Sequence, residues 1–268
     1  MDEARFSISA DDLYRCLGTA AAPLVVDVRR TAAYDADDRV IVGAVRCAPD
    51  EVAEWAHKHA DRPVVTCCVH GHEVSQQAAE TLRGVGIDAR YLAGGIGDWV
   101  ERNLPTRCKA DAQPAQWVTR ERPKIDRVAC PWLIRRFIDP EAAFLYVPTA
   151  DVFSTAAETG AVAYDIPGAE PFSHDGEFCS FDAFLKVYDI RDPALDALAL
   201  IVRGADTDRL ELTPQSAGLL AVTLGLSANC ADDDHAMLDH SMPIYDALYA
   251  WCRSLRGETH GWNPELGR

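Results

Sequence analysis

The sequence predicts two domains of different fold class. Residues 1–111 are expected to form an α/β domain, a parallel sheet with helices on both faces, and residues 112–268 a mainly α-helical domain. The first half alternates short β-branched runs with helical stretches, whereas the second half has long helical patterns and few strands. A chain of 268 residues with 48% hydrophobic composition is long enough for two cores.

The boundary between these domains falls in the polar stretch "NLPTRCKADAQPAQWVTRERPK". This stretch carries Pro105, Pro114 and Pro123 and has no apolar periodicity. Such a composition is typical of a linker. We therefore expect the first domain to end at residue 111.

Charge and cysteine content exclude several classes of partner. The formal net charge of −16 repels phosphate backbones and no lysine or arginine cluster offsets it, so no nucleic-acid partner is expected. No apolar run reaches the ~18 residues of a membrane span, and the acidic start "MDEARFSISADD" is unlike a signal peptide. Nine cysteines without paired spacing are typical of free thiols. These features predict a cytoplasmic protein with no membrane partner.

Four apolar runs in the first half are the expected strands. In a parallel α/β sheet, the ligand site lies at the carboxyl ends of the strands. The runs are "PLVVDV" (23–28), "AVRCAP" (44–49), "PVVTCC" (63–68) and "ARYLAG" (89–94).

The stretch "TCCVHGHEVSQQ" places Cys68 at the end of the third run, before a short loop. Ser75 is predicted to cap a helix that carries Ala78, Ala79 and Leu82 on one side. A tight loop ahead of a helix N-terminus points backbone N–H groups inward, and these stabilise a thiolate or an anion. Gly71 allows the loop to curl. Alternatively, Cys68 is only a small buried hydrophobic residue. Cys67 is expected to be one, because alternation along the strand points it away from Cys68.

Residues 6–105 resemble the rhodanese sulfurtransferases. The motifs are "LVVDVRR", "VGAVRCAPDEV", the cysteine loop and "YLAGGIGDW". The resemblance implies that Cys68 accepts a sulfane sulfur as a persulfide and passes it to a nucleophile. It also implies that backbone N–H groups hold the transferred sulfur or its oxyanion. The expected substrate-binding residues are Val69, His70, Gly71, His72, Glu73, Val74 and Arg29.

The loop departs from the usual rhodanese pattern at its fourth and fifth places. His72 and Glu73 stand where basic or polar residues help to bind thiosulfate, and Ser75 comes one residue late. Glu73 would repel thiosulfate by like charge, whereas protonated His70 or His72 would attract it, so the sequence leaves open whether thiosulfate is the donor. Two alternatives stay open: Cys68 senses or relays an oxidant, or the domain is a docking module with an inert cysteine.

Helical patterns dominate the second half. Pro131 is expected in a first helical turn, "FLYV" is a strand candidate, and Gly160 is expected to end a helix over "DVFSTAAET". "TPQSAGLLAVTLGLSA" predicts a buried core helix capped by Thr213. A last helix is expected from about Asp233 to Ser254, with an apolar stripe.

Polar clusters interrupt these helices at "FSHDGEFCSFD", "VRGADTDR" and "DDDHAMLDH". Histidine and carboxylate side chains are ligands for Fe, Mn or Zn, and a helical metal site draws one or two from each element. His174 with Asp206 is the first candidate pair, and Glu177 and His235 complete the expected set. Each piece also has a structural explanation, as a solvated helix start or a surface pair.

Residues 117–264 resemble the C-terminal domain of the chromate-resistance proteins. The motifs are "WVTRERPKIDRVACPWLIRRFIDP", "IPGAEPFSHDGEFCSFDAFL", "IVRGADT", "QSAGLLAVTLGLS" and "YDALYAWC". The resemblance implies a role in chromate resistance or detoxification. "KIDRVACPWLIRR" groups Lys124, Asp126, Arg127, Arg135 and Arg136 as an oxyanion-binding face or simply a solvated helix side.

Together, the two halves predict sulfur transfer through a Cys68 persulfide, coupled to a metal- or oxyanion-binding domain. The expected partners are a small sulfur donor and acceptor, with chromate or another oxyanion as the candidate target. The alternative is a non-enzymatic chromate or redox sensor or regulator. The sequence leaves the oligomeric state open.

Overall fold

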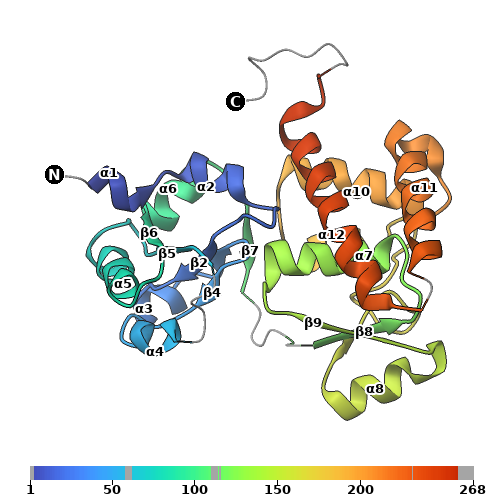
Figure 1. The fold of residues 1–268 in the computed structure, drawn as a ribbon, viewed down its shortest axis with the longest axis horizontal. Coiled ribbons are helices and arrows are strands. Elements are labelled where there is room, and N and C mark those ends of the chain that lie inside the picture. The colour runs from blue at the N-terminus through green and yellow to red at the C-terminus, as the bar shows by residue number, and fades with distance from the viewer. Residues whose placement is uncertain (1–2, 58–61, 110–113, 115, 231, 259–268) are drawn as a thin grey trace.

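The computed structural model describes residues 3–57, 62–109, 114, 116–230 and 232–258. Figure 1 shows two lobes, the first drawn from blue to cyan and the second from green to red. The expected boundary at residues 111 and 112 lies outside the described residues. Among the helices in the described part of the chain, none is long and apolar enough to cross a membrane.

The first lobe is built on a five-stranded sheet in the order β1-β6-β5-β2-β4, and every neighbouring pair is parallel. This confirms the predicted α/β class. All four expected runs form strands, and β1 is an addition of two residues. The strands are β1 (Ser7–Ile8), β2 (Leu24–Asp27), β4 (Val45–Arg46), β5 (Val64–Cys67) and β6 (Ala89–Leu92).

Helices cover both faces of this sheet because side chains alternate along each strand. Val65 and Cys67 pack in the same apolar cluster as Leu13 and Trp99, whereas Val64 packs in a second cluster with the buried residues of α4 and α5. The helices of this lobe are α1 (Glu3–Phe6), α2 (Ala10–Cys16), α3 (Thr31–Asp35), α4 (Val52–Ala56), α5 (Glu73–Gly84) and α6 (Gly95–Glu101).

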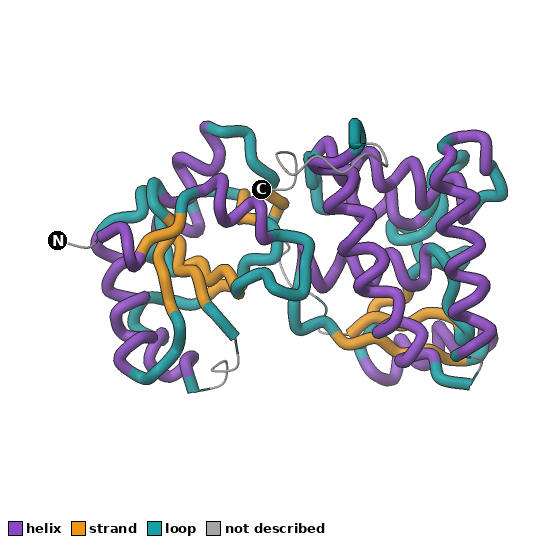
Figure 2. Tube along the Cα trace, turned by 45° about the horizontal axis from the view of Figure 1, so that its top comes forward, coloured by secondary structure: helices purple, strands orange, loops and turns teal. Residues whose placement is uncertain are grey.

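The second lobe is mainly helical, as predicted, with strands along one side (Figure 2). Its helices are α7 (Asp126–Leu133), extended by a π-helical turn (Ile134–Ile138), α8 (Val152–Thr159), α9 (Ser180–Val187), α10 (Pro193–Asp206), α11 (Pro214–Asn229) and α12 (Asp234–Ala250), extended by a second π-helical turn (Trp251–Leu255). Short 3-10 turns cover Thr149–Asp151 and Leu210–Leu212. The last helix, the helix ended by Gly160 and the Thr213 cap appear as expected.

Part of the stretch expected to be a linker is instead strand. β8 (Gln116–Arg120) lies at the centre of a parallel sheet between β10 (Val162–Ala163) and β9 (Ala143–Val147), which contains the "FLYV" run. Trp117 and Val118 are buried there. β7 (Thr106–Cys108) pairs antiparallel with β3 (Arg39–Ile41). These strands are short, and neighbouring residues on both of their faces are buried. Their sequences therefore lack the alternation of apolar and polar residues that predicts a strand.

Two helix predictions are wrong. Pro131 lies in the interior of α7, not in its first turn, because the helix already begins at Asp126. The helix α11 is not a buried core helix: Val222 and Leu224 are exposed, since the helix packs through a narrow face that includes Leu219.

One apolar core runs through both lobes. It includes Leu13 and Trp99 from the first lobe and Phe137 and Tyr249 from the second. Polar contacts join the same surfaces: the Tyr14 hydroxyl group donates a 3.2 Å hydrogen bond to Asp192, and Gly43 N–H donates to the Phe137 carbonyl at 2.7 Å. The two lobes are therefore packed into each other.

Candidate functional site

Cys68 follows directly after β5 and is buried, with 6% of its surface exposed. Its Sγ atom lies 3.1 Å from Ser75 Oγ and 4.0 Å from the His72 carbonyl oxygen. Cys67 belongs to the cluster on the opposite face of the sheet, as predicted. The Cys68 sulfur therefore faces the loop that follows it.

Helix α5 begins at Glu73, with His72 in the N-cap position. The prediction of Ser75 as the cap is thus wrong by three residues. The extended backbone of His72 ends the loop early, so Ser75 falls in the first helical turn and is fully buried. Its hydroxyl group contacts the cysteine sulfur instead of capping the helix.

The loop after Cys68 is held by the N-terminus of α6. Ile96 N–H donates to the Cys68 carbonyl at 2.9 Å and Gly97 N–H to the Val69 carbonyl at 3.0 Å. Gly95 has φ +61°, and a Cβ atom there would lie 2.3 Å from the Cys68 carbonyl oxygen. Within the described residues, the N–H groups of residues 69–74 donate to no protein acceptor. These donors are available to an anion near the sulfur.

The other expected substrate-binding residues fall into two groups. His70, His72 and Glu73 are exposed at the rim of the loop, and Glu73 accepts a hydrogen bond from Gln77. Arg29 is buried and donates to the carboxylates of Asp27 and Asp37. The prediction of a substrate contact for Arg29 is not supported, because its guanidinium is held in a buried ion-pair network.

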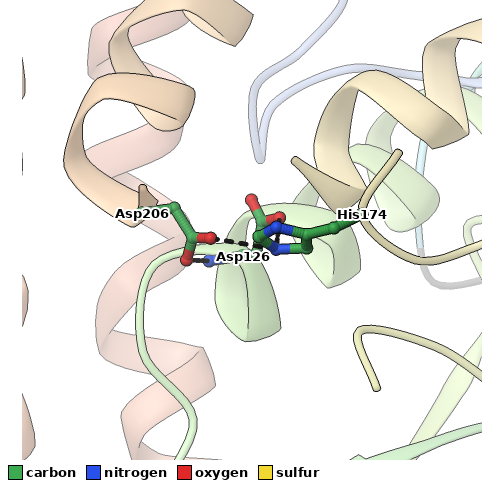
Figure 3. A group of neighbouring side chains, drawn as sticks. All are labelled: Asp126, His174 and Asp206. Carbon is green, nitrogen blue, oxygen red and sulfur yellow. Dashed lines mark hydrogen bonds and ion pairs between the residues drawn. The ribbon is translucent and has the colours of Figure 1, made fainter. Parts of the chain in front are cut away.

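A second cluster lies in the other lobe, where Asp126, His174 and Asp206 converge (Figure 3). His174 Nε2 is 3.1 Å from Asp206 Oδ2 and 3.7 Å from Asp126 Oδ2. The three side chains come from the start of α7, the loop before α9 and the end of α10. The first candidate pair, His174 with Asp206, is therefore brought together by the fold.

Asp126 is fully buried and was not predicted as a ligand. Its Oδ2 atom accepts hydrogen bonds from the N–H groups of Ser180 at 2.5 Å and Phe181 at 3.3 Å, at the start of α9. Its Oδ1 atom has no hydrogen-bond partner. A buried, unpaired carboxylate oxygen is costly unless a proton or a cation compensates it.

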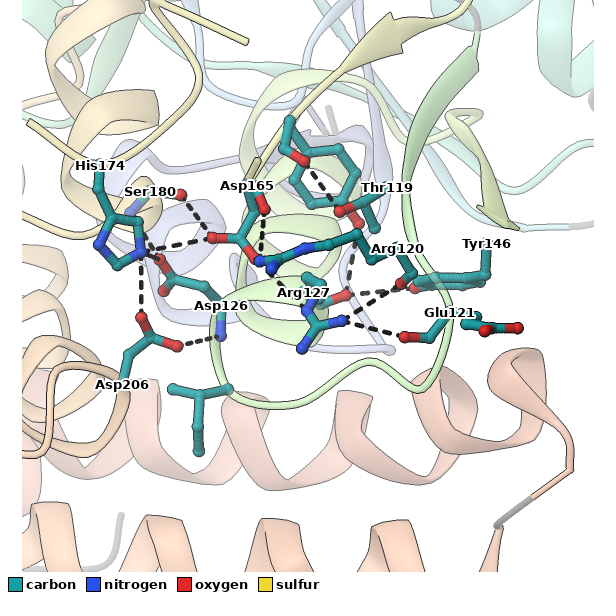
Figure 4. A network of polar contacts seen from close by, with 12 residues as sticks. Thr119, Arg120, Glu121, Asp126, Arg127, Tyr146, Asp165, His174, Ser180 and Asp206 are labelled. Atoms are coloured by element: carbon teal, nitrogen blue, oxygen red, sulfur yellow. Dashed lines mark hydrogen bonds and ion pairs between the residues drawn. The ribbon is translucent and has the colours of Figure 1, made fainter. Parts of the chain in front are cut away.

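Asp165 supplies a third carboxylate, which sequence reasoning also missed. Its Oδ1 atom is 3.4 Å from His174 Nε2, and its Oδ2 atom is 3.0 Å from Arg120 Nη2 and 3.4 Å from Arg127 Nε (Figure 4). Asp165 thus lies between the histidine and two arginines. An aspartate in the apolar context "AVAYDIPG" was the available signal.

The charged groups in this cluster shift one another's pKa values. Hydrogen bonding to Asp165 and Asp206 raises the pKa of His174 to about 10. Burial, with the nearby charges of Asp206 and Asp165, raises the pKa of Asp126 well above its usual range. Protons are therefore retained by this group of side chains at neutral pH.

Two predicted ligands lie outside the cluster. Glu177 is exposed and pairs with Arg209 at 3.1 Å, and His235 packs its ring against Tyr146 on another surface. Both belong to polar runs that the fold turns toward solvent. The grouping of cations near "KIDRVACPWLIRR" is also divided, since Arg127 contacts Asp165 and Arg136 binds Asp246.

A cleft of about 1010 Å³ opens beside His174. Its walls come from the loop before α9, from α9 itself and from α10. His174 is 41% exposed in its side chain. Solvent therefore reaches the cluster from this side.

Comparison with known families assigns both lobes. Residues 9–102 match the rhodanese-like domain and residues 117–252 match the C-terminal domain of ChrB. Protein ChrB of Cupriavidus metallidurans is 35% identical over 166 residues, which is 62% of this chain and 49% of the relative. The chain thus spans about half the length of the curated relative that it matches.

Solved structures similar to the first lobe include a rhodanese-related protein from Thermoplasma volcanium, 30% identical, covering 37% of this chain and 95% of that chain with a TM-score of 0.33. A rhodanese-like domain protein from Staphylococcus aureus is 26% identical and covers 35% of this chain and 89% of its own, with a TM-score of 0.31. The match to the ChrB domain spans half of the chain. The chain therefore belongs to the family defined by the ChrB C-terminal domain, which is joined here to a rhodanese-like domain.

Proposed function

We propose that this chain transfers sulfur through a persulfide on Cys68 and that it acts in chromate resistance or detoxification. The carrying observation is the setting of Cys68: a sulfur 3.1 Å from the Ser75 hydroxyl group, enclosed by a loop whose N–H groups are free of protein acceptors. Such donors stabilise a negatively charged sulfur. The rhodanese-like match of residues 9–102 supports the same reaction.

The transfer has two displacement steps. The Cys68 thiolate attacks a sulfane sulfur of the donor and forms a new S–S bond, while the donor's own S–S bond breaks and its remainder leaves with the electron pair. A nucleophilic acceptor then attacks the outer sulfur and releases the Cys68 thiolate. The loop N–H groups would hold the charge on the outer sulfur between these steps.

The expected donor is an alkyl persulfide, which carries at most one charge on its sulfur end, rather than thiosulfate. Glu73 is exposed on the rim of the loop and repels a dianion by like charge. A small nucleophile is the expected acceptor. The C-terminal domain is proposed to bind a metal or an oxyanion, chromate being the candidate, so that reactive sulfur meets an oxidised target at short range.

The test is turnover by the full chain. Purified protein is given cysteine persulfide with cyanide as acceptor, and thiocyanate formed above the rate without protein is measured beside the mass of the Cys68 peptide. Many turnovers, one added sulfur atom on Cys68, and loss of both in Cys68→Ser but not in Cys67→Ser would support the proposal. The Cys67→Ser variant is the matched control because Cys67 faces the other side of the sheet.

The alternative function is a non-enzymatic chromate or redox sensor or regulator. The depth of Cys68, 6% exposed, suits a thiol modified once by a small oxidant. In that case, the same assay would give stoichiometric modification without turnover. An unmodified Cys68 after exposure to several sulfane donors would instead indicate a docking domain with an inert cysteine.

A further inference from the structure

The donor atoms of the second cluster are arranged around one point. Asp126, His174 and Asp206 each offer a ligand atom, and these atoms lie within 4.8 Å of one another. Asp165 Oδ1 lies 3.4 Å from the same histidine nitrogen. In Figure 4, the carboxylates of Asp126, Asp165 and Asp206 all face the same edge of the His174 ring. One imidazole nitrogen facing three carboxylates has more acceptors than it can satisfy.

Asp126 has an unpaired carboxylate oxygen, Oδ1, in a fully buried position. The residue is fully buried, one oxygen is held by the α9 N-terminus, and the other has no hydrogen-bond partner. The carboxylate is turned toward His174 in Figure 4. Asp126 accepts a hydrogen bond from Ser180 at the start of α9 and donates its N–H to Asp206 at the end of α10. These contacts keep the residue buried. The oxygen that lies nearest His174, at 3.7 Å, is Oδ2, so a cation bound between the side chains would compensate the buried carboxylate as a whole.

The kind of cation follows from the donor set. Carboxylate oxygens suit Mg²⁺ and Mn²⁺, imidazole suits Fe²⁺ and Zn²⁺, and no cysteine belongs to the group of ligand atoms in the described residues. Three carboxylates with one imidazole and an open position favour Mn²⁺ or Fe²⁺, because these ions take more oxygen ligands than tetrahedral Zn²⁺. With a divalent ion bound, the three carboxylates would leave the site with a net charge of only −1.

The adjoining cleft is acidic and favours the same ligand class over an oxyanion. Its lining carries five carboxylates against two basic side chains, Lys186 and Arg203, besides His174, which is itself paired with Asp165 and Asp206. Both cations are already paired with cleft carboxylates, Lys186 with Asp175 at 3.4 Å and Arg203 with Asp182 at 2.6 Å. An oxyanion such as chromate would find no unpaired cation on this lining and would be repelled by its net charge.

We propose that Asp126, His174 and Asp206, with Asp165 beside them, form a binding site for Mn²⁺ or Fe²⁺ that opens into the cleft next to α9 and α10. This inference rests on the part of the proposed function that gives the C-terminal domain a metal or an oxyanion, and it selects the metal. The open side leaves a coordination position that a small ligand can reach, which is typical of a catalytic rather than a structural metal site.

The experiment uses the full chain stripped with a chelator. Mn²⁺ binding is followed by the loss of the free-ion electron paramagnetic resonance signal and by calorimetry, and Fe²⁺ without oxygen, Zn²⁺ and Mg²⁺ are titrated in parallel. One Mn²⁺ or Fe²⁺ per chain is expected. Affinity should fall by at least about tenfold in Asp206→Asn and in His174→Gln, since loss of even an outer-sphere partner costs that much.

Glu177→Gln and His235→Gln are the matched controls, because both residues lie outside the cluster and should leave affinity unchanged. Asp126→Asn is informative only if circular dichroism shows a folded chain, whereas His174 is partly exposed and its variant keeps the test valid. Absence of binding, equal binding in Asp206→Asn, or binding of Zn²⁺ alone would overturn the inference. Unchanged metal affinity in Cys68→Ser would separate it from the sulfur-transfer proposal.

Discussion

The two candidate sites are built in opposite ways. The Cys68 site is made within one stretch of eight residues and consists mainly of backbone N–H groups at a helix start. The His174 cluster is made from side chains at positions 126, 165, 174 and 206, which belong to separate elements. The first arrangement favours an anion and the second a cation. The functional groups of the first site therefore come from one local stretch, although α6 holds its loop in place, whereas those of the second site are brought together by long-range packing.

The largest loss of stability is expected from Arg29→Met, and this variant tests whether Arg29 has a structural or a substrate-binding role. Arg29→Met leaves Asp27 buried without its partner, and breaking such a pair costs about 3–5 kcal/mol. Urea unfolding measures this loss. Persulfide formation per folded molecule should be unchanged, since Arg29 is committed to Asp27 and Asp37. A stable variant that has lost sulfur transfer would restore Arg29 as a substrate contact.

A smaller effect is expected from closing the space on which the Cys68 loop depends. Gly95→Ala places a Cβ atom 2.3 Å from the Cys68 carbonyl oxygen at φ +61°. The expected cost is about 2–4 kcal/mol, from left-handed strain of about 1 kcal/mol and overpacking. Sulfur transfer should fall as well, because the loop must shift.

Gly86→Ala is the control for this change. It also has a positive φ, +91°, but a Cβ atom there meets nothing within 4 Å. Its unfolding free energy should fall by about 1 kcal/mol from backbone strain alone, with transfer unaffected. If the two alanine variants were equal in both measurements, close packing against the loop would not be what supports the Cys68 site.

The smallest effect tests the charge of the second cluster. The pKa of His174 is raised to about 10 by Asp165 and Asp206, above its ordinary value of 6.5. Protonated His174 therefore stabilises the folded chain fully below pH 6.5, and this contribution is lost as the pH rises through about 10. In chelator, His174→Gln should be less stable than the parent chain by on the order of 1 kcal/mol at pH 6, after allowance for solvent screening of a part-exposed group.

The difference in unfolding free energy between His174→Gln and the parent chain should shrink toward zero above pH 10. Thermal or urea unfolding of both, at several pH values and again in concentrated salt, checks this. Salt should reduce the difference at low pH. A difference that does not vary with pH would show that the His174 contribution is packing rather than charge.

The sequence alone was sufficient for features that depend on neighbours along the chain. The strands around Cys68 follow from β-branched runs, the Thr213 cap follows from a single side chain next to its helix, and the start of the last helix near Asp233 follows from its apolar stripe. The opposite orientations of Cys67 and Cys68 follow from strand alternation. These features need only backbone periodicity, which operates over a few residues.

Tertiary structure decided what depends on contacts between distant segments. β8 was taken for linker because its burial comes from β9 and β10, not from its own pattern. Asp126 and Asp165 could not be chosen among 42 acidic residues, and Glu177 and His235 could not be excluded. A carboxylate becomes a candidate ligand through its burial and its neighbours, and packing of the whole chain sets both.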